Sequence, residues 1–296
     1  MAVVLISGCS SGFGYASAVA FARAGDTVYA TVRTPAKGAA LAQLAAAEGL
    51  DIRLVTLDLR ETASFGTVVE TIVRQAGRID VLVNNAGIFR AGAFEDLDEA
   101  ALREVIETNL FAALLLTRSV LPHMRRQQGG YLIMISSLSG VAGLPGDVAY
   151  TASKFAIEGA TEALRHEVDH WHIKVALVEA GLYATSIFAQ TMAQGASVPP
   201  GYPPESPYRP LVEFRLQELR ARLPNAFDPE TLAAKLVAIS RSDGSQLRWP
   251  ADPVATKVLA TLFGQDDATR DRFLREVSGT EWWSQGAHSP SGGAKD

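Results

Sequence analysis

The chain has 296 residues, enough for one large α/β domain or two small ones. Hydrophobic residues make up 48% and charged residues 20% of it, a balance that supplies a full core and excludes global disorder. The net charge of −5 and the absence of a long basic run argue against a nucleic-acid partner.

The compartment is predicted from the cysteine count and the apolar runs. Cys9 is the single cysteine and cannot form an internal disulfide, so nothing points to an oxidising environment. The short apolar run after Met1 lacks the basic start and the length of a signal peptide. The most apolar later stretch, residues 111–124, is interrupted by Arg118 and Pro122. We expect a cytoplasmic protein without a membrane span.

Short β-rich runs alternate with longer amphipathic runs along most of the chain. Strands are predicted at residues 3–6, 27–32, 52–57, 80–83, 131–136, 173–178 and near 246–249. Helices are predicted at residues 16–24, 36–48, 62–75, 99–126 and 150–170. This alternation predicts an α/β fold, a Rossmann-type doubly wound parallel sheet with right-handed crossovers.

The alternation breaks after Thr185. Six prolines fall within residues 199–210, a density that disfavours regular structure and predicts a Pro-rich substrate loop over about 186–228. A flexible linker is the alternative. Helical patterns resume at 211–223 and 229–241, and the polar end at 288–296 predicts a flexible tail. We therefore predict a single domain over residues 1–287.

A glycine-rich turn follows the first strand and opens the first helix, with the sequence Ser7-Gly8-Cys9-Ser10-Ser11-Gly12-Phe13-Gly14. Glycines at such a junction let the backbone approach a pyrophosphate at the helix N-terminus. An ordinary βα turn is the alternative, because a glycine cluster alone is not specific.

Further motifs follow in order: Asp58, then Asn84-Asn85-Ala86-Gly87, Asn109, Ser137 and Tyr150-Thr151-Ala152-Ser153-Lys154. With the glycine turn, this ordered set resembles the short-chain dehydrogenase/reductase family over about residues 3–190. The stretches 28–31 and 152–159 are most similar to its hydroxysteroid and retinol dehydrogenase branch. The resemblance implies an oxidoreductase that acts on CH–OH groups with NAD(P) as acceptor.

Tyr150 and Lys154 carry the catalysis that the resemblance implies. Carbonyl reduction needs a proton, but the pKa of a free tyrosine is about 10. A cation four residues later on the same helix face is expected to lower that pKa. By resemblance, Tyr150 is the general acid/base, Lys154 also binds the nicotinamide ribose and Ser137 holds the substrate oxygen. Asn109 is expected to order a water in a proton relay; a buried amide bonded to backbone is its alternative.

The end of the second strand predicts the cofactor. NAD enzymes place an acidic residue there to hold the ribose 2′-hydroxyl, whereas Val32 occupies that position here. Arg33 suits a phosphate, and Ser11 adds a hydroxyl donor, so NADP(H) is preferred and NAD(H) is the alternative. The predicted cofactor residues are Gly8, Ser10, Ser11, Gly12, Phe13, Gly14, Arg33, Asp58, Leu59, Asn85, Ala86, Gly87, Tyr150, Lys154, Gly181, Leu182 and Thr185.

One position departs from the family pattern. Ala180 stands where the family usually has a proline before Gly181. Contacts of Leu182 and Thr185 with the nicotinamide remain expected, in a less rigid loop.

The predicted substrate pocket is apolar. Its walls are Phe89, Leu138, Leu144, Ile187 and Phe188, with Ile88, Phe94, Val141 and Leu182 as further candidates. No basic pair is obviously aimed at a substrate carboxylate or phosphate, so we expect a hydrophobic secondary alcohol and its ketone or aldehyde. Ordinary core packing is the alternative. By resemblance, the helices at 99–126 and 150–170 form a homodimer or homotetramer interface.

The sequence also raises two other hypotheses, a zinc site and a non-catalytic function. The stretch 166–170 matches the H-E-x-x-H zinc signature, but no third ligand is evident, so no metal site is predicted. A non-catalytic NADP-binding sensor or scaffold is the rival function, although such proteins commonly lack the tyrosine or lysine retained here.

Overall fold

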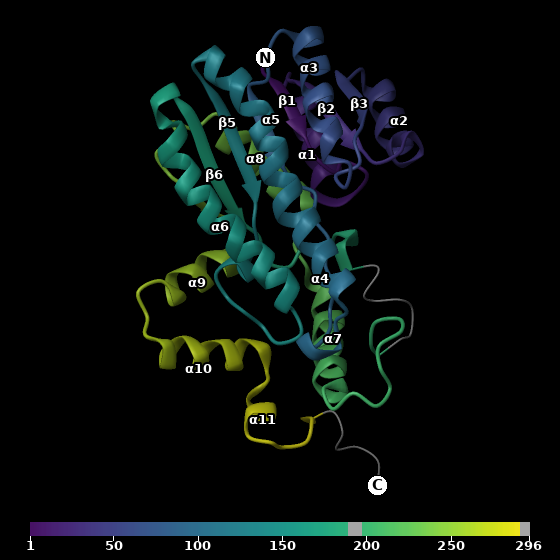
Figure 1. The fold of residues 1–296 in the computed structure, drawn as a ribbon, viewed down its shortest axis with the longest axis vertical. Coiled ribbons are helices and arrows are strands. Elements are labelled where there is room, and N and C mark those ends of the chain that lie inside the picture. Colours follow the sequence, from purple (N-terminus) through teal and green to yellow (C-terminus); the bar gives the residue numbers. More distant parts are fainter. Residues whose placement is uncertain (189–196, 291–296) are drawn as a thin grey trace.

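The centre of the molecule is a seven-stranded sheet in the order β3-β2-β1-β4-β5-β6-β7 (Figure 1). The computed structural model describes residues 1–188 and 197–290. All neighbouring strands are parallel, and the order reverses between β1 and β4, which confirms the predicted doubly wound sheet. The strands are β1 (Val3–Ile6), β2 (Thr27–Val32), β3 (Ile52–Thr56), β4 (Val81–Asn84), β5 (Gly130–Ile135), β6 (Ile173–Glu179) and β7 (Arg248–Pro250).

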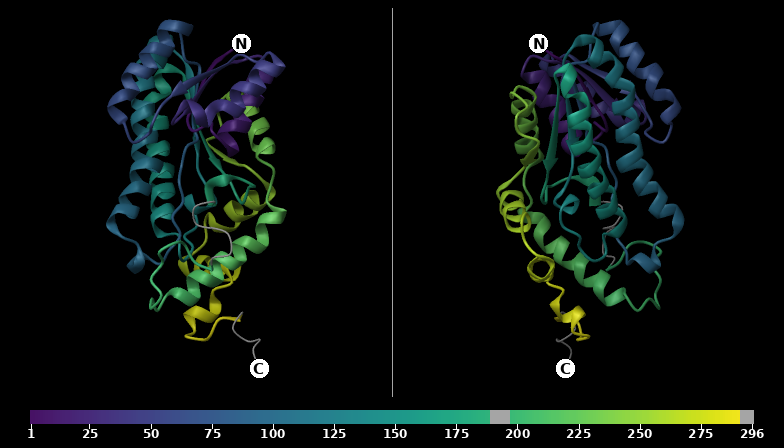
Figure 2. Two further views of the ribbon diagram at one scale, coloured as in Figure 1. Left: turned by 90° about the vertical axis from the view of Figure 1, so that its right-hand side faces the viewer. Right: turned by 60° about the vertical axis from the view of Figure 1, so that its left-hand side comes forward.

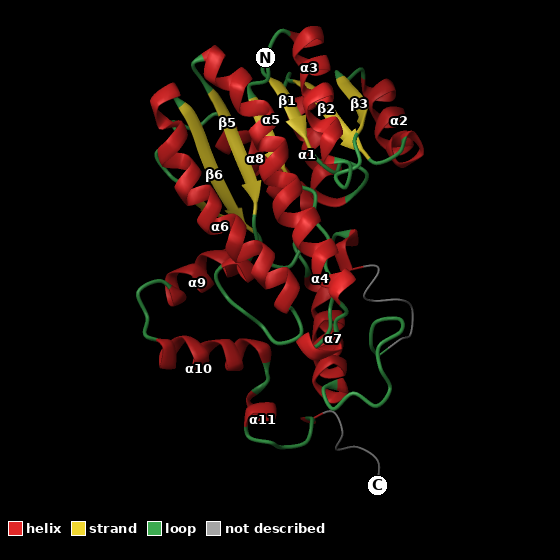
Figure 3. Cartoon of the chain, viewed as in Figure 1, coloured by secondary structure: helices red, strands yellow, loops and turns green. Residues whose placement is uncertain are grey.

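Helices cover both faces of the sheet (Figures 2 and 3). One layer holds α1 (Gly12–Arg23), α2 (Ala39–Glu48) and α8 (Pro229–Ser240); the other holds α3 (Phe65–Ala76), α5 (Ala112–Gln127) and α6 (Val148–Val168). Strand residues alternate between the two cores: Val4 and Ile6 pack in the first, and Leu5 packs in the second. Burial on both faces explains why these strands are continuous apolar runs.

The predicted long helix at 99–126 is interrupted. It consists of α4 (Glu99–Ile106), a π-helical turn (Glu107–Phe111) and α5. Among the described residues, Glu99–Gln127 is the helix long and apolar enough to cross a membrane by length and composition alone. Leu116, Val120 and Met124 are fully buried beside the sheet, as in a core helix.

Four helices lie beyond the carboxyl ends of the strands (Figure 1): α7 (Arg209–Arg222), α9 (Pro253–Leu262), α10 (Asp267–Ser278) and α11 (Glu281–Ser284). The expectation that the Pro-rich stretch is irregular up to Pro210 is wrong, because Pro210 lies in the first turn of α7. A proline is tolerated there since the first helical N–H groups have no partner within the helix. Helices α9 to α11 were not predicted, although Asp252 and Asp266 cap two of them.

Parts of two predicted segments lie outside the described residues: 189–196 of the substrate loop and 291–296 of the tail. The domain boundary at residue 287 stays a prediction.

The H-E-x-x-H stretch does not form one helix face. Helix α6 ends at Val168, and His170 lies in the following 3-10 turn (Asp169–Trp171). Among the residues that the structure describes, no group of three potential metal ligands occurs.

Candidate active site

A cavity of about 690 Å³ lies at the carboxyl edge of the sheet. Ligands bind at this edge in open α/β sheets, where the strand order reverses. Nearly all the predicted site residues line this one cavity, from the glycine turn to α7 and α9. The lining includes Ser137, Tyr150 and Lys154 and the five predicted substrate residues, whereas Gly14 and Asn109 do not line it.

The glycine turn is shaped by close backbone approaches. Gly8 and Gly12 have φ values of +74° and +57°, in the left-handed region that favours glycine. A Cβ at Gly8 would lie 2.7 Å from the Cβ of Ala86. A Cβ at Gly14 would lie 2.3 Å from the Gly8 carbonyl oxygen, so Gly14 packs behind the turn. Its predicted contact with the cofactor stays a prediction. The resulting cradle, open to the cavity, fits a pyrophosphate.

Asn85 and Ser7 hold this turn against the end of β4. The Asn85 amide donates to the carbonyl oxygens of Ser7 and Gly8, at 2.8 and 3.2 Å. The Ser7 hydroxyl accepts from the backbone N–H groups of Asn85 and Ala86, at 3.0 and 3.1 Å. The Asn85 side chain therefore fixes the shape of the turn. Ser7 lies inside the glycine motif but was not singled out from the sequence.

Cations gather where β2 and β3 end. Arg33 is exposed, and Lys37 and Arg60 line the same part of the cavity. Val32 is buried in the core, so no carboxylate is available at the position that NAD enzymes use. Asp58 accepts from Arg60 at 2.6 Å, and these hydrogen bonds lower the pKa of Asp58 to about 2. Lys37 and Arg60 were not singled out from the sequence. Lys37 is four residues after Arg33, whereas the fold brings Arg60, from the segment after β3, to the same cavity.

Tyr150 and Lys154 line the cavity from successive turns of α6. The Lys154 ammonium lies 5.6 Å from the Tyr150 ring centroid and donates to the carbonyl oxygen of Ile135 at 2.8 Å. Ser137 begins the turn after β5, where its hydroxyl accepts from the N–H of Ser139 at 3.1 Å. The three side chains predicted to act on the carbonyl thus face one space.

The expected lowering of the tyrosine pKa is not found. Burial raises the pKa of Tyr150 to about 12; the Ser137 hydroxyl lowers it, and the charge of Asp147 raises it further. Burial also lowers the pKa of Lys154 to about 8, although the charge of Glu158 acts to raise it. For both groups, desolvation changes the pKa more than any neighbouring charge does. The spacing of the two residues on the helix predicts only the effect of the cation.

Asn109 is fully engaged with its neighbours. Its amide donates to the Ile88 carbonyl oxygen at 2.9 Å and to the Ser153 hydroxyl at 3.1 Å, and its oxygen accepts from the Ile88 N–H at 2.8 Å. The alternative interpretation, a buried amide bonded to backbone, describes this geometry. Asn109 lies in a π-helical turn, which departs from regular α-helical hydrogen bonding. Such turns are often found near functional sites.

The loop that lacks the usual proline is held by other bonds. Gly181 donates its N–H to Asp252 at 2.9 Å, and the Ala180 carbonyl oxygen accepts from Leu138 at 3.0 Å. Thr185 lies against Gly12, whose Cβ would be 3.2 Å from that of Thr185. Asp252, which also caps α9, was missed; the Asp-Pro pair before a helical run was its signal.

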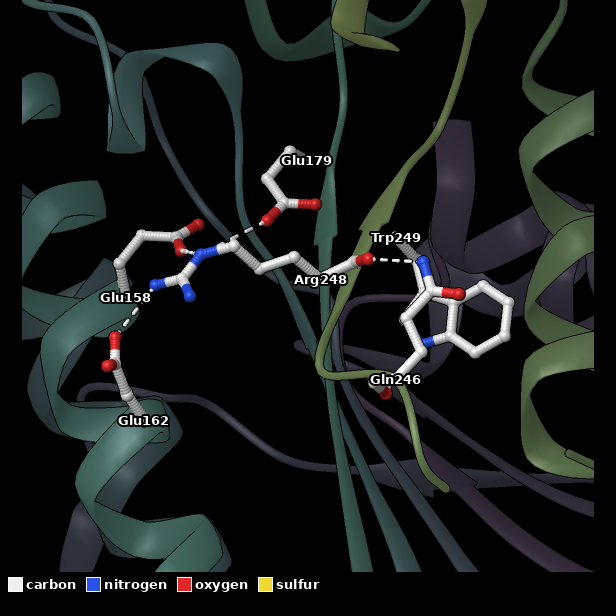
Figure 4. A network of polar contacts seen from close by, with 6 residues as sticks. All are labelled: Glu158, Glu162, Glu179, Gln246, Arg248 and Trp249. Atoms are coloured by element: carbon white, nitrogen blue, oxygen red, sulfur yellow. Dashed lines mark hydrogen bonds and ion pairs between the residues drawn. The ribbon is translucent and has the colours of Figure 1, made fainter. Parts of the chain in front are cut away.

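Arg248 is the centre of a partly buried ion-pair network (Figure 4). Arg248 donates to Glu158 at 3.2 Å and to Glu162 at 2.9 Å, and lies 3.8 Å from Glu179. Burial, with the charge of Glu158, raises the pKa of Glu179 to about 8. Because Glu158 is one turn from Lys154 and Glu179 precedes the Ala180-Gly181 loop, the network ties two walls of the site together. Sequence analysis did not detect it.

The substrate side of the cavity is largely aromatic and aliphatic. Phe89 packs edge-to-face on Tyr150 and on Phe188, with centroids 5.3 and 5.2 Å apart. Two of the further candidates are wrong: Phe94 is 61% exposed, and Val141 packs in a separate cluster, so neither lines the cavity. Arg215 and Arg222 of α7 do line it, although no basic pair was singled out from the sequence.

Comparison with known proteins agrees with this geometry. Residues 2–195 match the family model described as short chain dehydrogenase. The chain belongs to the short-chain dehydrogenase family. It is an oxidoreductase acting on CH–OH groups, with relatives that include retinol dehydrogenases.

Two curated relatives show the range of this similarity. A 3-ketodihydrosphingosine reductase of Bacteroides thetaiotaomicron is 39% identical over 183 residues, which cover 62% of this chain and 64% of that protein. The chain thus matches just under two thirds of that relative's length. Retinol dehydrogenase 8 of Bos taurus is 35% identical over 265 residues, covering 87% of this chain and 83% of that protein.

Two solved structures share the fold. A short-chain dehydrogenase from Streptomyces avermitilis has a TM-score of 0.75 and 31% identity, covering 99% of this chain and 98% of its own. A putative NAD(P)-dependent gluconate 5-dehydrogenase from Beutenbergia cavernae with bound NADP has a TM-score of 0.71 and 29% identity, covering 86% of this chain and 97% of its own.

Proposed function

We propose that this dehydrogenase uses NADP(H) to interconvert a hydrophobic secondary alcohol and its ketone, or a primary alcohol and its aldehyde, with Tyr150 as general acid/base. The observation that carries the proposal is the shared cavity, in which Tyr150 and Ser137 lie between the glycine turn and an apolar wall. The names of a retinol dehydrogenase and of an NADP-bound neighbour are consistent with this substrate and cofactor.

Each polar group has a defined task in the reaction. Bound NADP(H) supplies or accepts the hydride. In reduction, the Tyr150 hydroxyl donates its proton to the carbonyl oxygen while the Ser137 hydroxyl donates a hydrogen bond to the same oxygen. Lys154 stabilises the phenolate that Tyr150 leaves behind. The oxidation direction reverses these transfers.

The catalytic role of Tyr150 is tested by Tyr150→Phe. Removing a general acid typically costs 10²- to 10⁴-fold in rate, so we expect ketone reduction to fall by about that factor. NADPH binding, measured by calorimetry, should stay within a few-fold. Unchanged turnover would exclude Tyr150 as the acid. A wild-type protein that binds NADPH but turns over no ketone in a broad panel would instead favour the sensor or scaffold.

The preference for NADP(H) rests on Arg33 and Lys37 beside the buried Val32. We expect NADPH to bind more tightly than NADH. Loss of one charge-assisted contact in Arg33→Ala or Lys37→Ala should weaken NADPH binding about tenfold and leave NADH nearly unaffected. Parallel calorimetric titrations measure both affinities. Tighter NADH binding by the wild type would support the NAD-preferring alternative.

We also propose a cytoplasmic homodimer or homotetramer that associates through α4, α5 and α6. Phe111 and Phe155 are 45% and 43% exposed on these helices, which is apolar surface of the kind that interfaces cover. Light scattering of the purified protein measures the mass; a monomer at micromolar concentration would contradict the assembly.

A further inference from the structure

On the substrate side of the cavity, two side chains of opposite charge have no ion-pair partner among the residues that the structure describes. They are Asp147, at the start of α6, and Arg215, on the cavity face of α7. On α7, Val212, Leu216 and Leu219 line the cavity next to Arg215, and so does the ion pair of Glu218 and Arg222.

The other carboxylates of the cavity wall are all paired. Asp58 bonds Arg60 at 2.6 Å, Glu104 bonds Arg90 at 2.6 Å and Glu218 bonds Arg222 at 3.2 Å. Asp147 is the exception among the lining residues that the structure describes. It precedes α6 but makes no capping hydrogen bond, so its carboxylate does not serve the helix end.

Arg215 is anchored but incompletely satisfied. One guanidinium nitrogen donates to the Ser278 carbonyl oxygen at 3.0 Å, at the end of α10. Its Nε is buried and, within the described part of the chain, has no hydrogen-bond partner. No ion pair joins Arg215 to Asp147, although the two charges influence each other. A half-buried charge without a partner costs free energy that a polar ligand group would recover.

Asp147 lies near the reaction centre. Asp147 is the N-cap of α6 and Tyr150 is the third residue of that helix, so the carboxylate lies beside the turn that carries the tyrosine. The charge of Asp147 acts on Tyr150, as expected for groups this close. A substrate group that reaches Asp147 is therefore only a few bonds from the carbon that reacts at Tyr150.

Resting on the function proposed above, we propose that Asp147 and Arg215 recognise a hydroxyl group near the reacting carbon, so that the preferred substrate is an apolar hydroxyketone or the corresponding diol. A hydroxyl donates to the carboxylate and accepts from the guanidinium at once. A substrate carboxylate would meet Asp147 and a substrate ammonium would meet Arg215, so each of these groups is disfavoured by one of the two residues.

The test compares a straight-chain methyl ketone with its β-hydroxy, β-amino and β-carboxy derivatives of the same length. For the wild type, kcat/KM for the β-hydroxyketone should exceed that for the parent ketone by about tenfold or more, as expected for hydrogen bonds to charged groups. In Asp147→Leu and in Arg215→Met this ratio should fall to about one. The ratio compares two ketones on the same variant, so an effect of the substitution on the turnover of both ketones cancels.

Two controls separate recognition from structural damage. Arg222→Met removes a second arginine that also reaches the end of α10, through the Val277 carbonyl oxygen at 3.3 Å, but that has its own carboxylate partner. It should keep the wild-type ratio. Asp147→Asn retains a donor and an acceptor and should keep at least a third of the ratio. Turnover of the parent ketone reports folding in each variant.

Three results would overturn the inference: a wild-type ratio near one, a ratio that persists in both Asp147→Leu and Arg215→Met, or a preference for the β-amino or β-carboxy derivative. Absence of turnover of every ketone by a wild type that binds NADPH would overturn the proposed function itself. Turnover of the parent ketone and of the β-hydroxyketone with the same kcat/KM would overturn only the proposed recognition of the hydroxyl group.

Discussion

At the scale of single residues, the site depends on how burial changes the charge of each group. Desolvation is the largest influence on the pKa of Tyr150, Lys154 and Glu179, and neighbouring hydrogen bonds and charges have smaller effects. In the Arg248 network, one guanidinium faces three carboxylates, two of them buried. A group whose charged form is disfavoured by the fold makes stability depend on pH.

Glu179 yields a prediction with a definite sign. Its pKa rises from 4.5 to about 8 in the folded state, so the unfolded chain releases the proton at lower pH. The contribution of Glu179 to the free energy of unfolding should be fully present below about pH 4.5 and should be lost as the pH rises to about 8. In Glu179→Gln this decline should be smaller. Urea unfolding at several pH values between these limits measures it.

Glu162→Gln is the matched control for that experiment. Glu162 bonds the same arginine but is 56% exposed, and the hydrogen bond from Arg248 lowers its pKa. Its removal should leave the decline between these pH values in place. An equal decline in wild type and Glu179→Gln would show that Glu179 does not titrate in this range.

At the scale of elements, the site is built where a strand turns into a helix. The β1–α1 turn needs glycine for two reasons, positive φ at Gly8 and Gly12 and direct backbone contact at Gly14. The loops after β4, β5 and β6 supply Gly87, Ser137 and Gly181 to the same cavity. The glycine positions of the β1–α1 turn tolerate a side chain only if the neighbouring backbone moves.

Gly14→Ala tests the glycine turn as an element. The new Cβ would lie 2.3 Å from the Gly8 carbonyl oxygen and 2.6 Å from the Asn85 amide nitrogen, so the turn must shift. We expect a loss of about 1–3 kcal/mol in unfolding free energy, as for other overpacking changes, and weaker NADPH binding. Chemical denaturation and calorimetry measure the two effects.

Gly159→Ala is the control on a regular helix. Gly159 is an exposed residue of α6, and nothing lies within 4 Å of the added Cβ. Alanine should therefore stabilise the protein by about 0.5–1 kcal/mol through helix propensity. A Gly14→Ala protein as stable as the wild type would contradict the close packing of the turn.

At the scale of the whole molecule, the cavity is completed by segments far apart in sequence. Residues of α7 and α9 line the cavity together with the glycine turn, and Asp252 connects α9 to the loop after β6. Arg215 connects α7 to the end of α10 in the same way. Substitutions in the C-terminal region are therefore expected to affect cofactor binding and substrate binding together.

Asp252→Ala tests this connection. The buried carboxylate caps α9 through Ala255 at 2.8 Å and holds the Gly181 N–H at 2.9 Å. We expect a loss of about 2–4 kcal/mol in unfolding free energy and a raised KM for NADPH, because a buried N–H loses its acceptor. Asp266→Ala removes only the cap of α10 and should cost about 1 kcal/mol with KM unchanged. Equal effects of the two variants would contradict a role for Asp252 in the nicotinamide loop.

The sequence by itself determined the doubly wound sheet, the family and the residues at the carboxyl ends of β1, β4 and β5. Apolar periodicity and glycine position act through local geometry, so they can be read without the fold. Only the tertiary structure decided how Arg60 comes to line the cavity with Arg33, how Asp252 holds the Gly181 N–H, and how burial sets the pKa of Tyr150. It also decided that Asp147 and Arg215 face one cavity. These effects depend on distances between segments far apart in sequence and on the water they exclude, which no local pattern encodes.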